Sequence, residues 1–445
     1  MTDSEPLKRA ISPRMLVLFI VGDILGAGIY ALTGKVADEV GGAIWVPFLV
    51  AFLLAAMTAT AYAELAGKFP QAAGAALYTH KAFKRPFFTF LVAFAVLMSG
   101  ITSASAAARA FGGDYLAEFV DLPTVLVALG FVMGLAAINY WGIRESVKIN
   151  VVLTIVEVTG LVIILVIGAV ALLSGDGEPS RALDFDAENG VLLGVLGGTA
   201  LAFYALLGFE DTVNLAEETQ EPARAFPRAL FIGLAVTGVI YLGVAFVSSM
   251  ILPANELAGS SGPLLAVVEA SGVEFPPKLF AAIALLAVAN TALVNLIMAS
   301  RLLYGMARQG LVPRFLALVD GNRKTPYAAI LLTVVFAAVL VSTGDLTGLA
   351  DTTVLLLLLV FAVVNVSVLV LRREPVDHPH FHAPTIVPAI GAVACLVLAS
   401  PLTGREGPVY LRAGILLAIG VVLWAVDRLV RRDRPELDAE EISRA

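Results

Sequence analysis

The amino-acid sequence predicts an all-α, polytopic membrane protein with about twelve transmembrane helices, arranged as a five-plus-five inverted repeat with broken helices 1 and 6. Three observations support this prediction. Of the 445 residues, 59% are hydrophobic and 15% are charged, and the mean hydropathy is +0.90, as expected for a chain embedded in lipid. The apolar residues form twelve separate runs. Two of these runs are interrupted by glycines and acidic residues at membrane depth.

The twelve runs are each about 20 residues long, which is the length that a helix needs to cross a bilayer. They cover residues 15–36, 41–67, 87–112, 122–140, 148–173, 190–216, 228–252, 278–304, 326–342, 347–371, 385–402 and 409–430. All but six of the 29 Lys and Arg residues fall on the side of the N-terminus, and these residues gather on the cytoplasmic side of membranes. We therefore expect a multi-pass protein of the cell membrane, with cytoplasmic tails at 1–14 and 435–445 and a transmembrane domain at 15–434.

Composition and motifs exclude several classes of function. The formal net charge of −7 and the pI near 5.3 argue against nucleic acid as a partner. Residues 1–13 are polar and lead into a run that further runs follow, so no cleaved signal peptide is expected. The sequence has no nucleophile elbow, zinc-protease motif or phosphate-binding loop. We expect neither an enzyme nor a cofactor, and transport driven by ATP is not expected either.

One loop contains three candidate metal ligands, because His378, His380 and His382 are spaced two apart. Solvated loop histidines are the favoured interpretation, since no fourth Cys or His ligand is expected nearby. The single cysteine, Cys395, can form no disulfide within the chain. The sequence therefore predicts no metal site.

The first run is interrupted within residues 21–30, which read Val-Gly-Asp-Ile-Leu-Gly-Ala-Gly-Ile-Tyr. Three glycines and Asp23 stand at a depth where a helix must satisfy its own backbone hydrogen bonds. Polar groups at this depth are costly and are usually functional. We expect the helix to break at Gly26-Ala27-Gly28 and to expose Asp23 and backbone groups to a central cavity for a small polar ligand.

The sixth run is interrupted between residues 197 and 212. Glycines at its centre are followed by the pair Phe203-Tyr204 and then by Gly208, Glu210 and Asp211. Runs 1 and 6 are five apart and enter the membrane from opposite sides. Corresponding breaks of this kind predict inverted repeats, at about 15–173 and 190–371, with a binding site between them at mid-membrane. The helices at about 385–430 lie outside the repeats.

Two further acidic residues stand out along the chain. Glu157 lies about ten residues inside the fifth run, and Glu64 falls near the inner surface at the end of the second. The loop at 71–86 mixes small and aromatic residues and predicts a short interfacial or re-entrant helix.

Four motifs, in order, resemble those of the amino acid–polyamine–organocation (APC) permeases. They are residues 26–30 (G-x-G-I-[FY]), 63–70 (E-L-A…F-P), 208–228 (G-F-[DE]…A-E-E…P-x-R-x-x-P-R) and 300–313 (S-R…A-R-x-G…P). The resemblance covers nearly the whole chain and favours the amino acid permeases within that superfamily. It implies a LeuT-like fold of twelve helices.

The resemblance also implies roles for residues at both breaks. In the family, the unwound part of helix 1 offers backbone N–H groups to a substrate carboxylate, as bare helix ends do well. Carried onto this sequence, Ile24, Ala27 and Gly28 bind the carboxylate. The amine and side chain of the substrate contact Phe203, Tyr204, Ala205 and Leu207, with Tyr204 as an aromatic gate. The neighbouring Gly26 and Gly208 are included in the predicted site.

Two positions depart from the family pattern. Proton-coupled members often carry a Lys in helix 5, where this chain has Glu157, and most members have a small or apolar residue in place of Asp23. Asp23 is interpreted as a proton carrier, a cation ligand or the partner of a substrate ammonium, with helix capping as the structural alternative. Glu157 stays open between a proton relay and a structural acid. Glu210 is assigned to the site or to coupling, and Asp211 to the start of a half-helix.

The leading prediction is a secondary active transporter for amino acids or related amines, working by proton-coupled symport or exchange with alternating access. The alternative is a proton-coupled potassium symporter of the same superfamily. It rests on Gly22-Asp23-Ile24 and Tyr30-Ala31-Leu32, which resemble the G-D-I…Y-A-L stretch of potassium permeases. The A-E-E…P-R stretch favours amino acid permeases.

Overall fold

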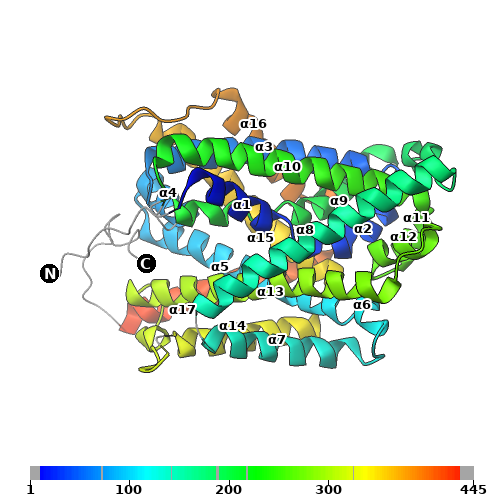
Figure 1. Ribbon diagram of the computed structural model, residues 1–445. Helices are drawn as coiled ribbons and strands as arrows, with labels where there is room; N and C mark the ends of the chain where they lie inside the picture. Colours follow the sequence, from blue (N-terminus) through cyan, green and yellow to red (C-terminus); the bar gives the residue numbers. More distant parts are fainter. Residues whose placement is uncertain are drawn as a thin grey trace.

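The structure, a computed structural model, describes residues 11–71, 74–141, 143–186, 190–216, 219–323 and 325–430. Its regular elements are helices (Figure 1). In these ranges eight helices are long and apolar enough to cross a membrane, or nine if the bent pair α1 and α2 is one span. The eight are α3 (Trp45–Lys68), α5 (Pro86–Phe111), α7 (Thr124–Trp141), α8 (Ile143–Ser174), α10 (Pro222–Ile251), α13 (Pro277–Arg308), α15 (Leu346–Leu371) and α17 (Gly407–Val430). The predicted all-helical, multi-pass class is confirmed. Residues 1–10 and the tail at 435–445 lie outside the described residues.

Three shorter apolar helices occupy the remaining predicted runs. They are α9 (Val191–Ala205), α14 (Tyr327–Thr343) and α16 (Ile386–Ala399). With 15, 17 and 14 residues, they are roughly 21–26 Å long, somewhat less than a hydrocarbon core of about 30 Å. Each predicted run therefore contains a helix, whereas the count of twelve spans stays a prediction.

Shorter helices lie in the connecting segments. They are α4 (Gly74–Phe83), α6 (Asp114–Ala117), α11 (Ala254–Gly259), α12 (Pro263–Ala270) and the 3-10 helices η1 (Pro179–Leu183), η2 (Asp211–Leu215), η3 (Arg314–Ala317) and η4 (Pro401–Thr403). The helix predicted within the loop at 71–86 is α4.

The first span is broken one or two residues earlier than predicted. Helix α1 (Pro13–Ile24) begins at Ser12, whose side chain accepts a hydrogen bond from the Met15 N–H, and α2 (Ala27–Val40) follows at an angle of 42°. The break consists of Leu25 and Gly26, because Ala27 and Gly28 already form the first turn of α2. An extended Gly26 lets the chain leave one helix and start the next within two residues.

The sixth run is broken as well. Helix α9 ends at Ala205, a non-helical turn covers 206–210, and η2 follows. The two breaks touch one another. A Cβ at Gly28 would lie 2.5 Å from the Ala205 Cα, and a Cβ at Gly208, where φ is +121°, would lie 2.4 Å from the Asp23 carbonyl oxygen. Only glycine permits this approach and this φ.

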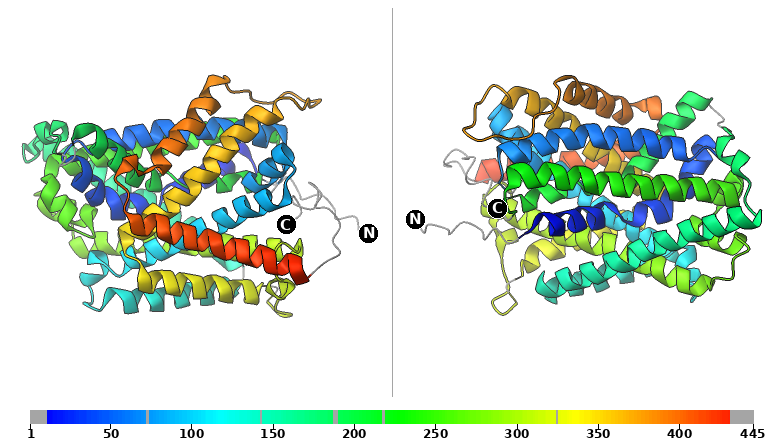
Figure 2. Two further views of the ribbon diagram at one scale, coloured as in Figure 1. Left: turned by 180° about the vertical axis from the view of Figure 1, so that it is seen from behind. Right: turned by 45° about the horizontal axis from the view of Figure 1, so that its top comes forward.

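The helices form a bundle, and the two breaks lie inside it, since Leu25 and Leu206 are buried. Helices α3 and α10 run along one edge, α7 and α14 lie side by side along the opposite edge, and α5, α13 and α15 pass between them (Figures 1 and 2). The start of α1 and the end of α17 lie at the same end of the bundle. The interior is therefore enclosed by long, continuous helices.

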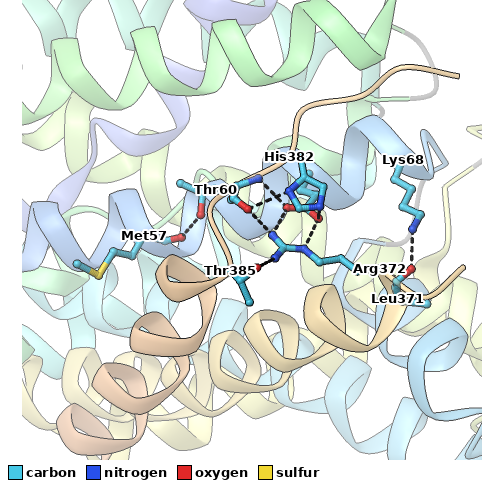
Figure 3. A network of polar contacts seen from close by, with 9 residues as sticks. Met57, Thr60, Lys68, Leu371, Arg372, His382 and Thr385 are labelled. Atoms are coloured by element: carbon cyan, nitrogen blue, oxygen red, sulfur yellow. Dashed lines mark hydrogen bonds and ion pairs between the residues drawn. The ribbon is translucent and has the colours of Figure 1, made fainter. Parts of the chain in front are cut away.

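Helix α15 is held at both ends by contacts between an arginine and a buried carboxylate. At one end, Arg372 donates to both oxygens of Glu64 on α3, at 2.8 and 2.7 Å (Figure 3). The Ala383 N–H, in the segment leading to α16, donates to the same carboxylate at 2.9 Å. At the other end, Arg405, just beyond α16, donates to Asp351 Oδ1 at 2.7 Å. The segments on both sides of α16 thus fasten it to α15.

Candidate functional site

A cavity of about 300 Å³ lies where the two breaks meet. Ten of the residues predicted from the sequence line it: Asp23, Ile24, Gly26, Ala27, Gly28, Tyr204, Ala205, Leu207, Gly208 and Glu210. Phe203 does not line it; this side chain is fully buried and packs against Phe361 with ring centroids 6.0 Å apart. The two breaks, far apart in the sequence, therefore contribute to one hollow.

Hydroxyl groups from neighbouring helices hold the backbone at the first break. The Gly26 N–H donates to the Tyr241 hydroxyl at 3.2 Å, and that hydroxyl donates to the Ile24 carbonyl at 3.0 Å. The Ala27 N–H donates to Thr291 Oγ1 at 2.8 Å. Buried backbone groups need such partners. A ligand carboxylate would therefore have to replace Thr291 in order to reach the Ala27 N–H.

Tyr204 joins α9 to α5 beside the cavity. Its hydroxyl lies 3.1 Å from Ser103 Oγ and 3.2 Å from the Ser103 carbonyl oxygen. Next to it, Thr353 Oγ1 donates to Thr102 Oγ1 at 2.7 Å and links α15 to α5. These contacts fix the Tyr204 ring in one orientation in the cavity wall.

Three carboxyl groups line the cavity at the breaks, from Asp23, Glu210 and Asp211. Glu210 Oε2 accepts a hydrogen bond from the Gly208 N–H at 2.8 Å. Asp23 Oδ2 is buried and has no hydrogen-bond partner among the described residues. Buried polar atoms nearly always have a partner, so an exception of this kind calls for a functional explanation.

Glu157 lies away from the cavity, behind the first break. The residue is fully buried, and neither carboxyl oxygen has a hydrogen-bond partner within the described part of the chain. The Asn290 amide is the polar side chain that faces it, and it also donates to Thr154 Oγ1 at 3.4 Å. The Tyr30 hydroxyl donates to the Glu157 backbone carbonyl at 2.9 Å and ties α2 to α8.

Several lining residues were not predicted. They are Tyr62, Ser103, Asp211, Thr291, Asn295, Arg301 and Thr353. Two pairs carried a usable signal, because Ser99 and Ser103 on α5, and Thr291 and Asn295 on α13, are polar residues spaced four apart in apolar helices. Such a pair shares a helix face.

The histidine loop packs against the end of α3. His378 Nε2 lies 3.1 Å from the Gly67 carbonyl oxygen, and His382 Nε2 lies 3.9 Å from Glu64 Oε1. In the ranges that the structure describes, no three His, Cys, Asp or Glu residues are placed to hold a metal ion.

The geometry is that of a bundle with a cavity between two discontinuous helices, lined by three carboxyl groups and many apolar residues. The sequence profile of a family described as amino acid permease matches residues 11–424. The chain belongs to this amino acid permease family. The resemblance to APC permeases is thereby confirmed, and so is the expectation that the protein is a transporter and not an enzyme.

Curated relatives of this permease align over most of its length. It is 27% identical to the branched-chain amino acid permease BcaP of Bacillus subtilis (strain 168), covering 94% of this chain and 93% of that protein. It is 30% identical to the vacuolar cationic amino acid transporter 4 of Arabidopsis thaliana, covering 83% and 64%. It is 26% identical to the methylthioribose transporter of Bacillus subtilis (strain 168), covering 95% and 94%. The permease therefore carries an amino acid or a related substrate through a membrane.

Proposed function

We propose that the permease is a secondary active transporter of an amino acid or related amine, with the substrate bound in the cavity between the two breaks. The observation that carries the proposal is the contact of both breaks around one cavity that three carboxyl groups line. Backbone groups there end their helical pairing, as at substrate sites of transporters with discontinuous helices. The names of the relatives range from branched-chain and cationic amino acids to methylthioribose, so they support the class of substrate and leave its side chain open.

We propose twelve spans in the cytoplasmic membrane, with repeats at about 15–173 and 190–371, two extra helices at about 385–430 and both termini in the cytoplasm. The distribution of Lys and Arg supports this orientation. In this orientation the cavity belongs to an inward-facing state of an alternating-access cycle. Its lining includes Gln309 and Leu311 at the cytoplasmic end of α13, whereas the Tyr204 contact with Ser103 lies on the outer side.

We propose the proton as the coupling ion, with Asp23, Glu157 and Glu210 as candidate carriers. Three observations support them: Asp23 lines the cavity and has one buried oxygen without a partner among the described residues, Glu157 is fully buried, and Glu210 lines the cavity at the second break. A charged carboxylate is very costly in such surroundings, whereas the neutral acid is not. Access of water in one state and burial in the other would let these groups take up and release a proton.

Purified protein in liposomes with an imposed pH gradient tests the proposal. Labelled L-leucine, L-lysine, putrescine and methylthioribose are offered in parallel with a rubidium tracer. We expect one of the organic substrates to accumulate with the gradient and to lose accumulation when an ionophore collapses it. Accumulation that depends on a sodium gradient and not on the pH gradient would contradict proton coupling but not the proposed class of substrate.

The second candidate is a proton-coupled potassium symporter. Asp23 favours it, because its buried carboxyl oxygen has no partner among the described residues and carboxylate oxygens are suited to a cation. Rubidium flux without uptake of any organic substrate would establish this alternative and contradict the leading proposal.

A further inference from the structure

The cavity continues past the helix breaks along one face of α13. Its lining residues on this helix recur every three or four positions, from Thr291 through Met298 and Arg301 to Gln309, as expected for a single face. At 1.5 Å per residue, Thr291 and Arg301 are roughly 15 Å apart along the helix axis. The lining then reaches Leu311, where α13 has ended. The cavity therefore extends from the breaks to one end of the bundle.

The charged lining residues are divided along this length. The three carboxyl groups of Asp23, Glu210 and Asp211 lie at the breaks, and Arg301 is the one basic residue among the described lining residues. Beyond Arg301, the lining residues of α13 and its C-cap are Leu302, Gly305, Met306 and Gln309, none of which is charged. A single positive charge thus stands between the acidic end of the cavity and its mouth.

Arg301 also differs both from the arginines that are held by protein oxygens and from arginines such as Arg308, which are exposed. Arg109, Arg372, Arg405 and Arg412 each donate to a carbonyl or carboxylate oxygen. Arg301 is half-buried, and its guanidinium has neither a hydrogen bond nor an ion pair in the described ranges. A guanidinium in this position has its five donors available.

We propose that Arg301 is a second binding station, which takes the carboxylate of an amino acid on its way between the cavity mouth and the breaks. A guanidinium binds a carboxylate through two parallel hydrogen bonds, and partial burial strengthens them. The acids at the breaks attract the ammonium group and repel the carboxylate. The substrate therefore travels with its ammonium toward Asp23 and its carboxylate toward Arg301. This inference rests on the proposed function.

Distance separates this station from the site at the breaks. An α-amino acid carries its ammonium and its carboxylate on the same carbon atom, whereas roughly 15 Å of helix separate Arg301 from Thr291. One molecule cannot contact both places through these two groups. Arg301 therefore acts before or after the substrate is held at the breaks and affects access from one side of the membrane.

The test compares an amino acid with its amide, which keeps the ammonium and lacks the carboxylate. Membrane vesicles of both orientations take up labelled L-lysine or L-leucine, whichever the wild type transports, in competition with the same amino acid or its amide. At the face where α13 ends, we expect Arg301→Gln to reduce the preference for the acid over the amide roughly tenfold, which corresponds to about 1.4 kcal/mol. At the other face, this preference stays as in the wild type.

The preference is the ratio of the inhibition constants of the amino acid and its amide. Because both are measured in the same membranes, the ratio does not depend on how much of the protein is folded. Arg301→Lys keeps the charge but loses the paired donors, so we expect an intermediate ratio. Arg308→Gln is the matched control, since Arg308 lies on the same helix over the Tyr304 ring and does not line the cavity. If Arg301→Gln leaves the preference for the acid over the amide unchanged, Arg301 is not a binding station. An equal change at both faces would also contradict the proposal, because it would indicate that Arg301 anchors the protein to lipid. If the wild type takes up none of the organic substrates offered above, the proposed function fails instead.

Discussion

Two buried carboxyl groups, those of Asp23 and Glu157, are the residues on which the proposed proton coupling depends. Asp23 lines the cavity, whereas Glu157 is fully buried behind the first break and does not line it. Both have unpartnered oxygens in the described structure. We therefore expect substitution of Asp23 to affect both substrate binding and gradient-driven uptake, and substitution of Glu157 to affect gradient-driven uptake alone.

Glu157→Gln should keep substrate exchange and lose accumulation driven by a pH gradient. Glutamine has nearly the same shape and fits beside Asn290, but it carries no titratable proton. Exchange and gradient-driven uptake are measured in the same liposomes, with the exposed Glu256→Gln on α11 as control. Full pH-driven accumulation in Glu157→Gln would assign this residue a structural role.

Asp23→Asn should abolish uphill uptake and also weaken substrate binding, because Asp23 lines the cavity. Loss of one charged hydrogen-bond partner typically weakens binding by about 1.5–3 kcal/mol, or roughly 10- to 150-fold. Equilibrium binding by the detergent-purified protein and uptake in liposomes measure the two effects separately. Retained accumulation would remove Asp23 from the coupling mechanism.

At the scale of elements, the contact between the two breaks is the feature that shapes the site. Gly208→Ala should lower both the thermal unfolding midpoint and the transport rate. The new Cβ would lie 2.4 Å from the Asp23 carbonyl oxygen, at a φ of +121° that alanine does not adopt without strain. Gly130→Ala on α7 is the matched control, since no atom lies within 4 Å of a Cβ there. Equal unfolding midpoints in the two variants would show that the breaks do not need this close approach.

The sequence could predict the two breaks but not the whole lining of the cavity. Glycines and acids within apolar runs reveal where a helix loses its pairing, and they led to Asp23, Gly28 and Glu210. Helical periodicity indicates which residues share a face but not which face meets a cavity, so Thr291 and Ser103 were missed. The break itself was placed slightly late, because Ala27 and Gly28 give no sign that they already belong to the next helix.

At the scale of the whole molecule, the contact of Glu64 with Arg372 joins α3, α15 and the segment before α16. Glu64→Gln should lower the free energy of unfolding by about 2–3 kcal/mol. Removing one partner of a buried ion pair costs about 3–5 kcal/mol, and we expect less because the Arg372 side chain keeps 14% of its exposure. Chemical unfolding followed by tryptophan fluorescence measures the difference. Glu178→Gln is the control, because the Glu178 contact with Arg181 is largely exposed and such pairs contribute little. An equal loss in both variants would contradict the importance of burial.

The same contact can form only late in the synthesis of the protein. Glu64 and Arg372 are 308 residues apart in the chain, and ribosomes add about 5–20 residues per second. The carboxylate of Glu64 is thus synthesised roughly 15–60 s before its guanidinium partner, and the Ala383 N–H follows later still. During that interval the end of α3 must keep its charge in water or at the lipid headgroups. These ends of α3 and α15 can pack together only when nearly all of the chain up to Ala383 has been synthesised.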